Sequence, residues 1–497
     1  MIDIQVKLHD RYSVECKVGY HVDRDTGENE FRMNAWFFIP HSLDINASTY
    51  PKEAFYRDVK SNVRLITPIY TLEEIASGEW TPFVFLEDAF QHLVADGTRD
   101  ALASYEYQIK MFTSIFKSAL RGMAGETIHH EVESGEREGM VDRYVECVQL
   151  IVRRYRDLKA IINVPEIPRE ALNYFSFGDE YLSNLVEFHT FKLLDGLKTT
   201  DPGCYDRTVK LLLSLVYSEV DYKKQNGYLV ADPESKDRNQ TVIYRRGMLK
   251  KYAESDLFLK ASKKKDGVLV EQIYYSIAAG LSMIFATVVA FSFQKKYGNF
   301  TMPLFVALVV SYMLKDRIKE LMRFYFAHRL GKNYFDRKTT ISMNERVVGW
   351  IKDGVDFISE RKVPEEIVER RARPDLLEAD NRNGGEKIIL YRKWVQLDPE
   401  ALDEYSQYDI AGVNEILRFN VGSFVQKMDE RDYELYVPRG EADYGLIMGD
   451  KIYYLNFLIQ LLHGEQVEYK RYRLVINRDG IQEIQKMFCQ CTGIYLL

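Results

Sequence analysis

The stretch that most constrains this chain runs from Ile273 to Phe293, because it contains no charged residue. At the helical rise of about 1.5 Å per residue, a helix of this length extends about 31 Å, which matches the hydrocarbon core of a bilayer. A second uncharged run, from Asn299 to Leu314, follows closely and ends at Lys315. The two runs predict a hairpin of two transmembrane helices inside an otherwise water-soluble chain.

The second run is the shorter of the two. At about 24 Å, a helix of this length would cross the bilayer with little tilt or enter it only partly. Pro303 near its start fits a first helical turn, where a missing N–H is tolerated. The alternative interpretation is a helical hairpin buried in the core of a large soluble domain.

Small side chains recur at four-residue intervals in both runs. Helices in lipid associate through close backbone approach across such faces. The pattern therefore predicts that the two helices pack against each other or mediate self-association. The predicted packing residues are Ala278, Ser282, Ala286, Ala290, Ala307 and Ser311.

Basic residues flank the pair of runs on its outer sides, whereas the loop between the runs has only Lys295 and Lys296. By the positive-inside rule, we expect an integral membrane protein with both termini in the cytoplasm. Each flanking charge near anionic headgroups contributes about 1 kcal/mol to membrane binding. The residues predicted to lie at the membrane surface are Lys263, Lys264, Lys265, Lys315, Arg317, Lys319 and Arg323.

Composition restricts the classes of protein to which this chain can belong. The apolar fraction of 46% and the charged fraction of 28% are typical of folded protein. The net charge of -7 is spread along the chain and argues against nucleic acid as a partner. The five cysteines are odd in number and, apart from Cys489 and Cys491, widely spaced, so they give no disulfide framework and favour a reducing compartment.

Sequence periodicity predicts an α+β multidomain membrane protein of five regions. Alternation at Ile2, Ile4 and Val6 is typical of a half-buried strand, whereas Tyr105, Ile109 and similar positions follow a helical stripe. Whether N- and C-terminal strands share one sheet stays open. The regions are a β-rich N-terminal region (1–86), a cytoplasmic helical domain (87–265), the transmembrane hairpin with an amphipathic extension (266–332), a charged helical linker (333–385) and a mostly antiparallel β C-terminal domain (386–497).

One segment resembles part of a metal site. Glu126 and His129 are three residues apart and Glu133 lies four further on, a spacing that places carboxylate and imidazole on one helix face. Carboxylate-bridged di-metal bundles need this Glu-x-x-His pair twice, and the chain has it once. The segment also lies between Gly122 and Gly139, where a solvated break between helices is the simpler interpretation.

Arg153, Arg154 and Arg156 follow an apolar helix face, which indicates a solvated or headgroup-facing surface. The chain has no phosphate-binding glycine loop and no G-x-S-x-G nucleophile motif.

The sequence therefore predicts a membrane-anchored cytoplasmic scaffold or interaction protein without catalysis or cofactor. Its expected partners are an anionic lipid bilayer and other proteins or further copies of itself, with no nucleic acid. Two alternatives stay open: a metal-dependent enzyme that uses Glu126, His129 and Glu133, and an oligomeric pore formed by the hairpin.

Overall fold

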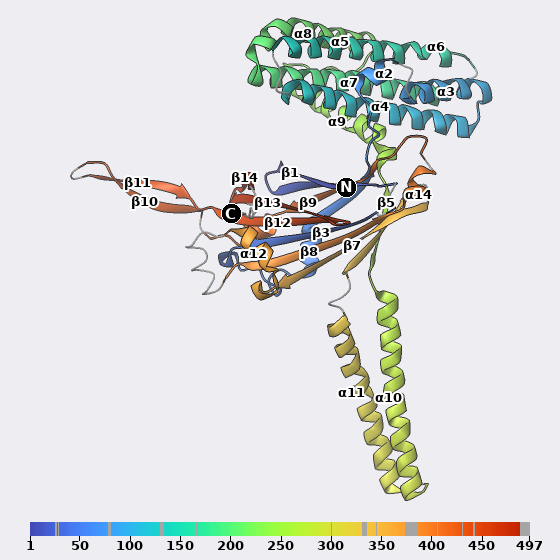
Figure 1. Ribbon diagram of the computed structural model, residues 1–497, viewed down its shortest axis with the longest axis vertical. Helices are drawn as coiled ribbons and strands as arrows, with labels where there is room; N and C mark the ends of the chain where they lie inside the picture. Colours follow the sequence, from blue (N-terminus) through green and yellow to red (C-terminus); the bar gives the residue numbers. More distant parts are fainter. Residues whose placement is uncertain are drawn as a thin grey trace, which may run out of the picture. The chain divides into compact units, whose positions relative to one another are not determined.

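The chain forms two compact units, here called the sheet unit and the helical unit. The sheet unit comprises Met1–Val63, Lys260–Tyr405 and Gly412–Leu497, and the helical unit comprises Arg64–Leu259 and Ser406–Ala411. The fold mixes helices with antiparallel sheets (Figure 1). The computed structural model describes residues 1–24, 27, 29–77, 81–129, 134–165, 167–299, 301–330, 335–343, 345–372, 385–404, 406–429, 431–440 and 443–487.

The larger sheet has eight strands in the order β14-β13-β12-β3-β8-β7-β6-β5. All its neighbouring strands run antiparallel. In chain order the strands are β3 (Glu30–Ile39), β5 (Lys260–Lys265), β6 (Arg337–Met343), β7 (Arg346–Ile358), β8 (Lys387–Leu397), β12 (Tyr453–His463), β13 (Gln466–Asn477) and β14 (Gly480–Met487).

The smaller sheet has the order β1-β2-β9-β4. Its strands are β1 (Ile2–Asp10), β2 (Ser13–His21), β4 (Val59–Leu65) and β9 (Gly412–Asn420). Strands from both ends of the chain interleave: Ala35 of β3 lies opposite Ile459 of β12 on one side and Tyr391 of β8 on the other. Strand β2 likewise pairs with β9. The N- and C-terminal strands therefore share both sheets, which answers the question that the sequence left open.

The prediction of a charged helical linker over 333–385 was wrong for most of its described part. This range supplies strands β6 and β7, and α12 (Glu365–Arg371) is a short helix after them. Strand β7 is rich in β-branched and aromatic residues, which favour a pleated surface, and it buries Val348, Ile351 and Val355. The charged residues between these positions had concealed the pattern.

Short elements complete the sheet unit. Strand β9 ends at Asn420 and is followed by a helical turn. The remaining elements are η1 (His41–Leu43), α1 (Lys52–Asp58), η3 (Glu360–Lys362), α14 (Pro399–Asp403), α15 (Gly422–Val425), β10 (Asp432–Pro438) and β11 (Tyr444–Asp450).

The helical unit follows the predicted apolar stripes. Tyr105, Ile109 and Phe112 of the first long stripe are fully buried. Side chains cap several of its helices at their N-termini. Asp201 accepts from the Cys204 N–H before α8, and Ser235 accepts from the Arg238 N–H before α9. The elements are α2 (Leu72–Ser77), α3 (Thr81–Asp96), α4 (Arg99–His129), α5 (Ser134–Asp157), α6 (Lys159–Ile162), α7 (Arg169–Thr200), α8 (Pro202–Gln225), α9 (Lys236–Ala253) and η2 (Ser255–Leu257).

Ion pairs lie inside this helical unit. The Arg156 guanidinium donates to Asp179 Oδ1 at 3.1 Å and to Glu219 Oε2 at 2.7 Å, and both carboxylates are buried. The prediction that Arg156 belongs to a solvated or headgroup-facing surface was therefore wrong. The buried Lys223 ammonium pairs with Glu187, which also accepts from Arg246 at 2.7 Å. Each buried charge has an opposite partner, as burial in a low-dielectric interior requires.

Candidate membrane helix pair and neighbouring cavities

Two long helices leave the sheet unit between adjacent strands of the larger sheet. Helix α10 (Val268–Tyr297) follows β5, and helix α11 (Met302–Leu330) precedes β6. Gly267 and Gly298 bound α10 with φ angles of 69° and 77°, a conformation that glycine adopts without steric cost. The two helices lie side by side (Figure 1).

The contact between the helices is made by small side chains. Ala278 and Ser282 of α10 are buried, as are Ala307 and Ser311 of α11. The Ser311 hydroxyl donates to the Ala286 carbonyl oxygen at 3.4 Å. Ala286 itself is half-buried, and so is Ala290, the remaining position of the four-residue series. The structure thus places the series at the contact within one chain.

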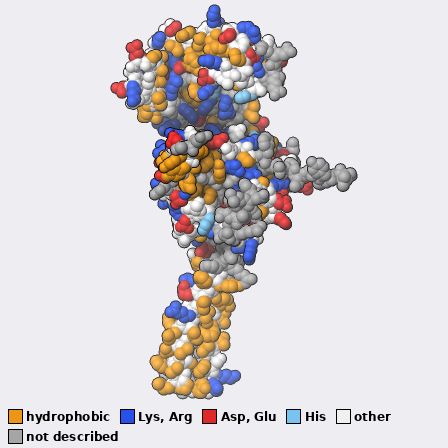
Figure 2. All heavy atoms as spheres, turned by 90° about the vertical axis from the view of Figure 1, so that its left-hand side faces the viewer, with side chains coloured by type: hydrophobic (Ala, Val, Ile, Leu, Met, Phe, Trp, Pro, Cys, Tyr) orange, Lys and Arg blue, Asp and Glu red, His pale blue; other side chains and the backbone are white. Residues whose placement is uncertain are grey.

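The opposite faces of the pair carry large apolar side chains. Ile284 is 60% exposed and Phe291 is 66% exposed on α10, and Phe305 is 62% exposed on α11. In Figure 2 the pair has a mostly orange surface with blue side chains near its ends. Within the described part of the chain, one helix is long and apolar enough to cross a membrane, over Val270–Tyr297. Helix α11 does not meet the same criterion, so the predicted two-helix transmembrane hairpin is not established.

The alignment of the two helices along their axes determines which part of α10 lies beside the charged residues of α11. Ser311 lies beside Ala286, and the Arg323 guanidinium lies 5.1 Å from the Tyr275 ring centroid. The charged segment of α11 that begins at Lys315 therefore runs alongside the first half of α10, although α10 is uncharged there from Ile273 onward. The band that is apolar on both helices is consequently no longer than the apolar part of α11.

The predicted membrane-surface lysines belong to strand β5. Lys263, Lys264 and Lys265 are exposed there, and the Lys265 ammonium pairs with Glu271 at 2.8 Å. The other predicted membrane-surface residues, Lys315, Arg317, Lys319 and Arg323, all lie on α11. The predicted basic residues thus occur on the strand that precedes α10 and within α11 itself.

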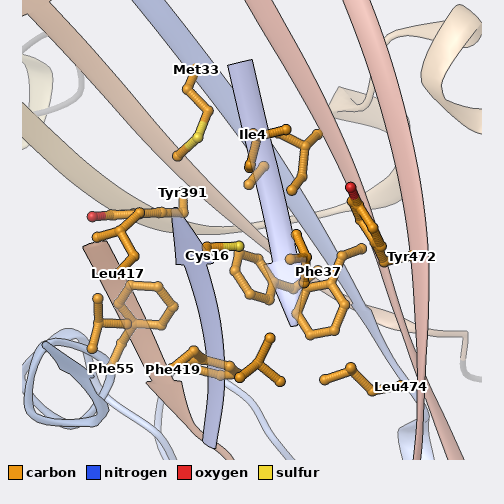
Figure 3. A pocket seen from close by; sticks show the side chains of 16 residues that line it. Ile4, Cys16, Met33, Phe37, Phe55, Tyr391, Leu417, Phe419, Tyr472 and Leu474 are labelled. Carbon is orange, nitrogen blue, oxygen red and sulfur yellow. The ribbon is translucent and has the colours of Figure 1, made fainter. Parts of the chain in front are cut away.

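An apolar cavity of about 60 Å³ lies between the two sheets (Figure 3). Phe37, Phe55 and Phe419 contribute rings to its lining, and the Cys16 sulfur lies among them. Burial raises the pKa of the Cys16 thiol to about 12, so this group stays a neutral, unreactive thiol. Pockets for small molecules usually measure about 300–1,000 Å³. The cavity is thus a packing defect of the core.

A polar cluster lies next to the strands that connect to the helices. The buried Lys393 ammonium pairs with Glu415, whose carboxylate also accepts from the Ser61 hydroxyl at 2.6 Å and the Tyr20 hydroxyl at 3.2 Å. Burial raises the pKa of the nearby Asp353 carboxyl. The cavity here measures about 20 Å³, enough for one water molecule. This arrangement joins the sheets and has no room for a substrate.

A larger hollow of about 370 Å³ lies on the helical unit between α5 and α8. Arg156 and Glu219 line it, but their charged groups already bind each other. The Tyr222 ring covers the Arg156 guanidinium at 3.4 Å. The other polar side chains of its lining are Gln149, Arg153, Asp157 and Ser218.

Of the predicted metal-binding residues, Glu126 and His129 lie at the end of α4. This helix continues through Gly122 to His129, so the expected break begins later than the sequence indicated. Glu126 and His129 are both exposed, and Glu133 lies outside the described residues. Among the residues that the structure describes, no group of three or more His, Cys, Asp or Glu side chains could hold a metal ion.

No protein-family model matches the chain. A search of curated proteins gives no match either. Among solved structures, the chain is similar to a de novo designed 16-helix transmembrane nanopore, at 10% identity and a TM-score of 0.15, over 52% of this chain and 93% of the designed one. A similarity this low carries no functional argument.

Proposed function

We propose that this protein is a membrane-anchored interaction protein without catalytic activity of its own. In this proposal the α10–α11 pair is embedded in the bilayer, and the rest of the sheet unit and the helical unit lie in the cytoplasm. The observation that carries the proposal is the exposure of large apolar side chains along α10, combined with the absence of charge from Ile273 to Phe293. Soluble proteins rarely expose a continuous apolar surface of this kind.

The register of the pair supports a shallow insertion. The apolar part of α11, from Met302 to Leu314, extends about 20 Å, which is shorter than a hydrocarbon core of about 30 Å. Lysine side chains can extend along apolar surface to reach headgroups. Lys296 near the turn and Lys315 at the other end of the band are suitably placed to do so. The flanking basic residues favour a cytoplasmic location for both termini.

The proposal is tested by alkaline carbonate extraction of membranes that contain the full chain, followed by protease treatment of sealed vesicles. We expect the chain to stay in the washed pellet, with both units cut from the cytoplasmic side and a fragment that contains the turn between α10 and α11 protected. Release of the chain by carbonate would contradict the anchor and leave the pair as an interaction surface of a soluble protein.

A cysteine probe separates a full span from a partial one. Asn299→Cys at the turn reacts with an impermeant maleimide from the far side of the membrane only if the turn reaches that side. The unsubstituted chain, with its five native cysteines, is the matched control. Labelling from neither side indicates a turn that ends within the bilayer.

The pore alternative has less support. The small-residue faces already pack within one chain, and neither uncharged run has an ionisable side chain to conduct ions. The enzyme alternative also has less support, because the described residues contain no group of side chains that could hold a metal ion. Conductance across reconstituted bilayers would revive the first, and stoichiometric metal in purified protein would revive the second.

A further inference from the structure

Strands β10 and β11 form a two-stranded ribbon that pairs with no other strand in the described part of the chain. Figure 1 shows it extending away from the larger sheet. Large apolar and aromatic side chains on both of its faces are 47–72% exposed. They are Tyr433, Leu435, Tyr436, Tyr444, Leu446, Ile447 and Met448.

A ribbon of this kind has little stability of its own. Isolated two-stranded hairpins are marginal in water, and open strand edges are templates for pairing with another chain. One face brings Leu435 opposite Ile447, whereas the other brings the Tyr436 and Tyr444 rings within 6.1 Å of each other. A partner that covered either face would therefore remove apolar side chains from water and stabilise the ribbon.

The ribbon is acidic. Between Asp432 and Asp450 the sequence has five acidic residues and a single arginine. At its base, Arg431 and Lys451 add two positive charges, and Arg431 pairs with Asp432 and Asp450. The remaining negative charge disfavours an anionic lipid surface as the covering partner, because the acidic groups would be repelled by the headgroups. It favours a basic strand edge instead.

Strand β5 offers such an edge. It is the terminal strand of the larger sheet, paired with β6 on one side. All six of its residues, Lys-Ala-Ser-Lys-Lys-Lys, are exposed, and four of them are lysines. The opposite terminal strand, β14, has one glutamate and one lysine and thus no net charge. The ribbon strands, at seven residues each, are close in length to the six residues of β5.

We propose that the β10–β11 ribbon of one copy adds to the β5 edge of a second copy of this chain. Backbone hydrogen bonds would extend the larger sheet from one chain into the next, and carboxylates of the ribbon would face the lysines of β5. Because the two surfaces differ, the contact is head-to-tail and generates a ring if the rotation closes or a filament if it does not.

This inference rests on the proposed function as an interaction protein and identifies the partner as a second copy of the chain. It does not depend on the membrane anchor. Carbonate extraction tests the anchor, whereas oligomeric mass tests the ribbon, so either idea can fail alone.

A charge exchange tests the contact. The full chain, purified in mild detergent, is compared by sedimentation across a concentration series. Asp432→Lys with Glu434→Lys reverses the charge on strand β10 of the ribbon. Lys260→Glu with Lys264→Glu reverses the charge on one face of β5. We expect each pair to weaken self-association roughly tenfold or more, and the chain carrying all four substitutions to recover most of it.

The apolar part has a matched control. Tyr436 of the ribbon and Tyr217 of α8 are both 64% exposed. Tyr436→Ser should weaken self-association, whereas Tyr217→Ser should leave it unchanged. The proposal is overturned if the parent chain is monomeric at all concentrations, if neither charge reversal changes its mass, or if the four substitutions together fail to restore association.

Discussion

Helices α7 and α10 are nearly equal in length, at 32 and 30 residues, and yet they meet opposite surroundings. Helix α7 buries side chains around most of its circumference, including the polar Asp179, Glu180 and Glu187. Helix α10 exposes its large apolar side chains, and among its described residues the buried ones are the small Ala278 and Ser282. The first helix is thus packed as in a protein interior, whereas the second has the length and the apolar composition that a membrane-spanning helix needs.

The difference lies in where charge is tolerated. Helix α7 accepts buried carboxylates because each has a cationic partner, such as Arg156 for Asp179 and Arg245 for Glu180. From Ile273 to Phe293 helix α10 has no charge and offers none to a partner. Bilayer interiors impose this exclusion, whereas an interior made of protein can supply the opposite charge.

The largest effect should come from placing charge on the exposed face of α10. Ile284→Arg with Val288→Arg alters two side chains that point away from α11, at 60% and 57% exposure. Each arginine at the centre of a membrane helix costs about 2.5–3.5 kcal/mol. We expect the doubly substituted chain to be lost from the carbonate-washed pellet.

The control is an equally exposed pair on the helical unit. Ile243 and Tyr244 of α9 are 70% and 71% exposed, and Ile243→Arg with Tyr244→Arg should leave the chain in the pellet. If the α10 variant also remains in the washed pellet, α10 does not lie in lipid. The difference in exposure between α7 and α10 would then reflect only how each helix packs in the protein.

The next effect concerns the paired charges around α7. Arg156→Leu leaves the buried Asp179 and Glu219 carboxylates without their shared cation. Breaking one side of a buried ion pair costs about 3–5 kcal/mol. We expect amides of α7 and α8 to lose hydrogen-exchange protection in the full chain, with the strands of the sheet unit unaffected.

Arg153→Leu on the same helix is the matched control. Arg153 is exposed, so its replacement should change stability by no more than about 0.5 kcal/mol. Equal loss of protection in both variants would mean that the ion pairs around α7 are not what holds this unit together.

Local pattern was sufficient for the helices. The long stripe through Tyr105 and Phe112 and the uncharged run from Ile273 both became helices, since periodicity and length report directly on helical faces. The small-residue series could also be read from spacing alone, and it lies at the α10–α11 contact.

Long-range pairing could not be read in this way. Nothing local in β3 specifies that it lies between β8 and β12, whose paired residues come at least 348 residues later in the chain. Strand β7 was missed because its charged positions, such as Lys352 and Asp353, resemble a polar helix. The ion pairs of Arg156 were missed because its partners come from two other helices, which its local sequence does not specify.

The smallest effect uses one glycine in each helix. Alanine gains about 1 kcal/mol over glycine in a helix interior. At Gly178 of α7 the added Cβ would overlap the Tyr155 hydroxyl and lie 2.8 Å from Ile109 Cγ2. The Tyr155 ring is stacked between Phe112 and Phe175, so it has little freedom to withdraw. Overpacking of this kind costs about 1–3 kcal/mol.

At Gly280 of α10 the added Cβ would meet no atom within 4 Å, so the propensity gain is not opposed. We therefore expect Gly178→Ala to lower the stability of the full chain by about 1 kcal/mol, and Gly280→Ala to leave it unchanged or raise it. Hydrogen exchange of α7 and α10 measures both. A stabilising Gly178→Ala would show that the interior around α7 is looser than its contacts indicate, and that the two helices differ in solvent more than in packing density.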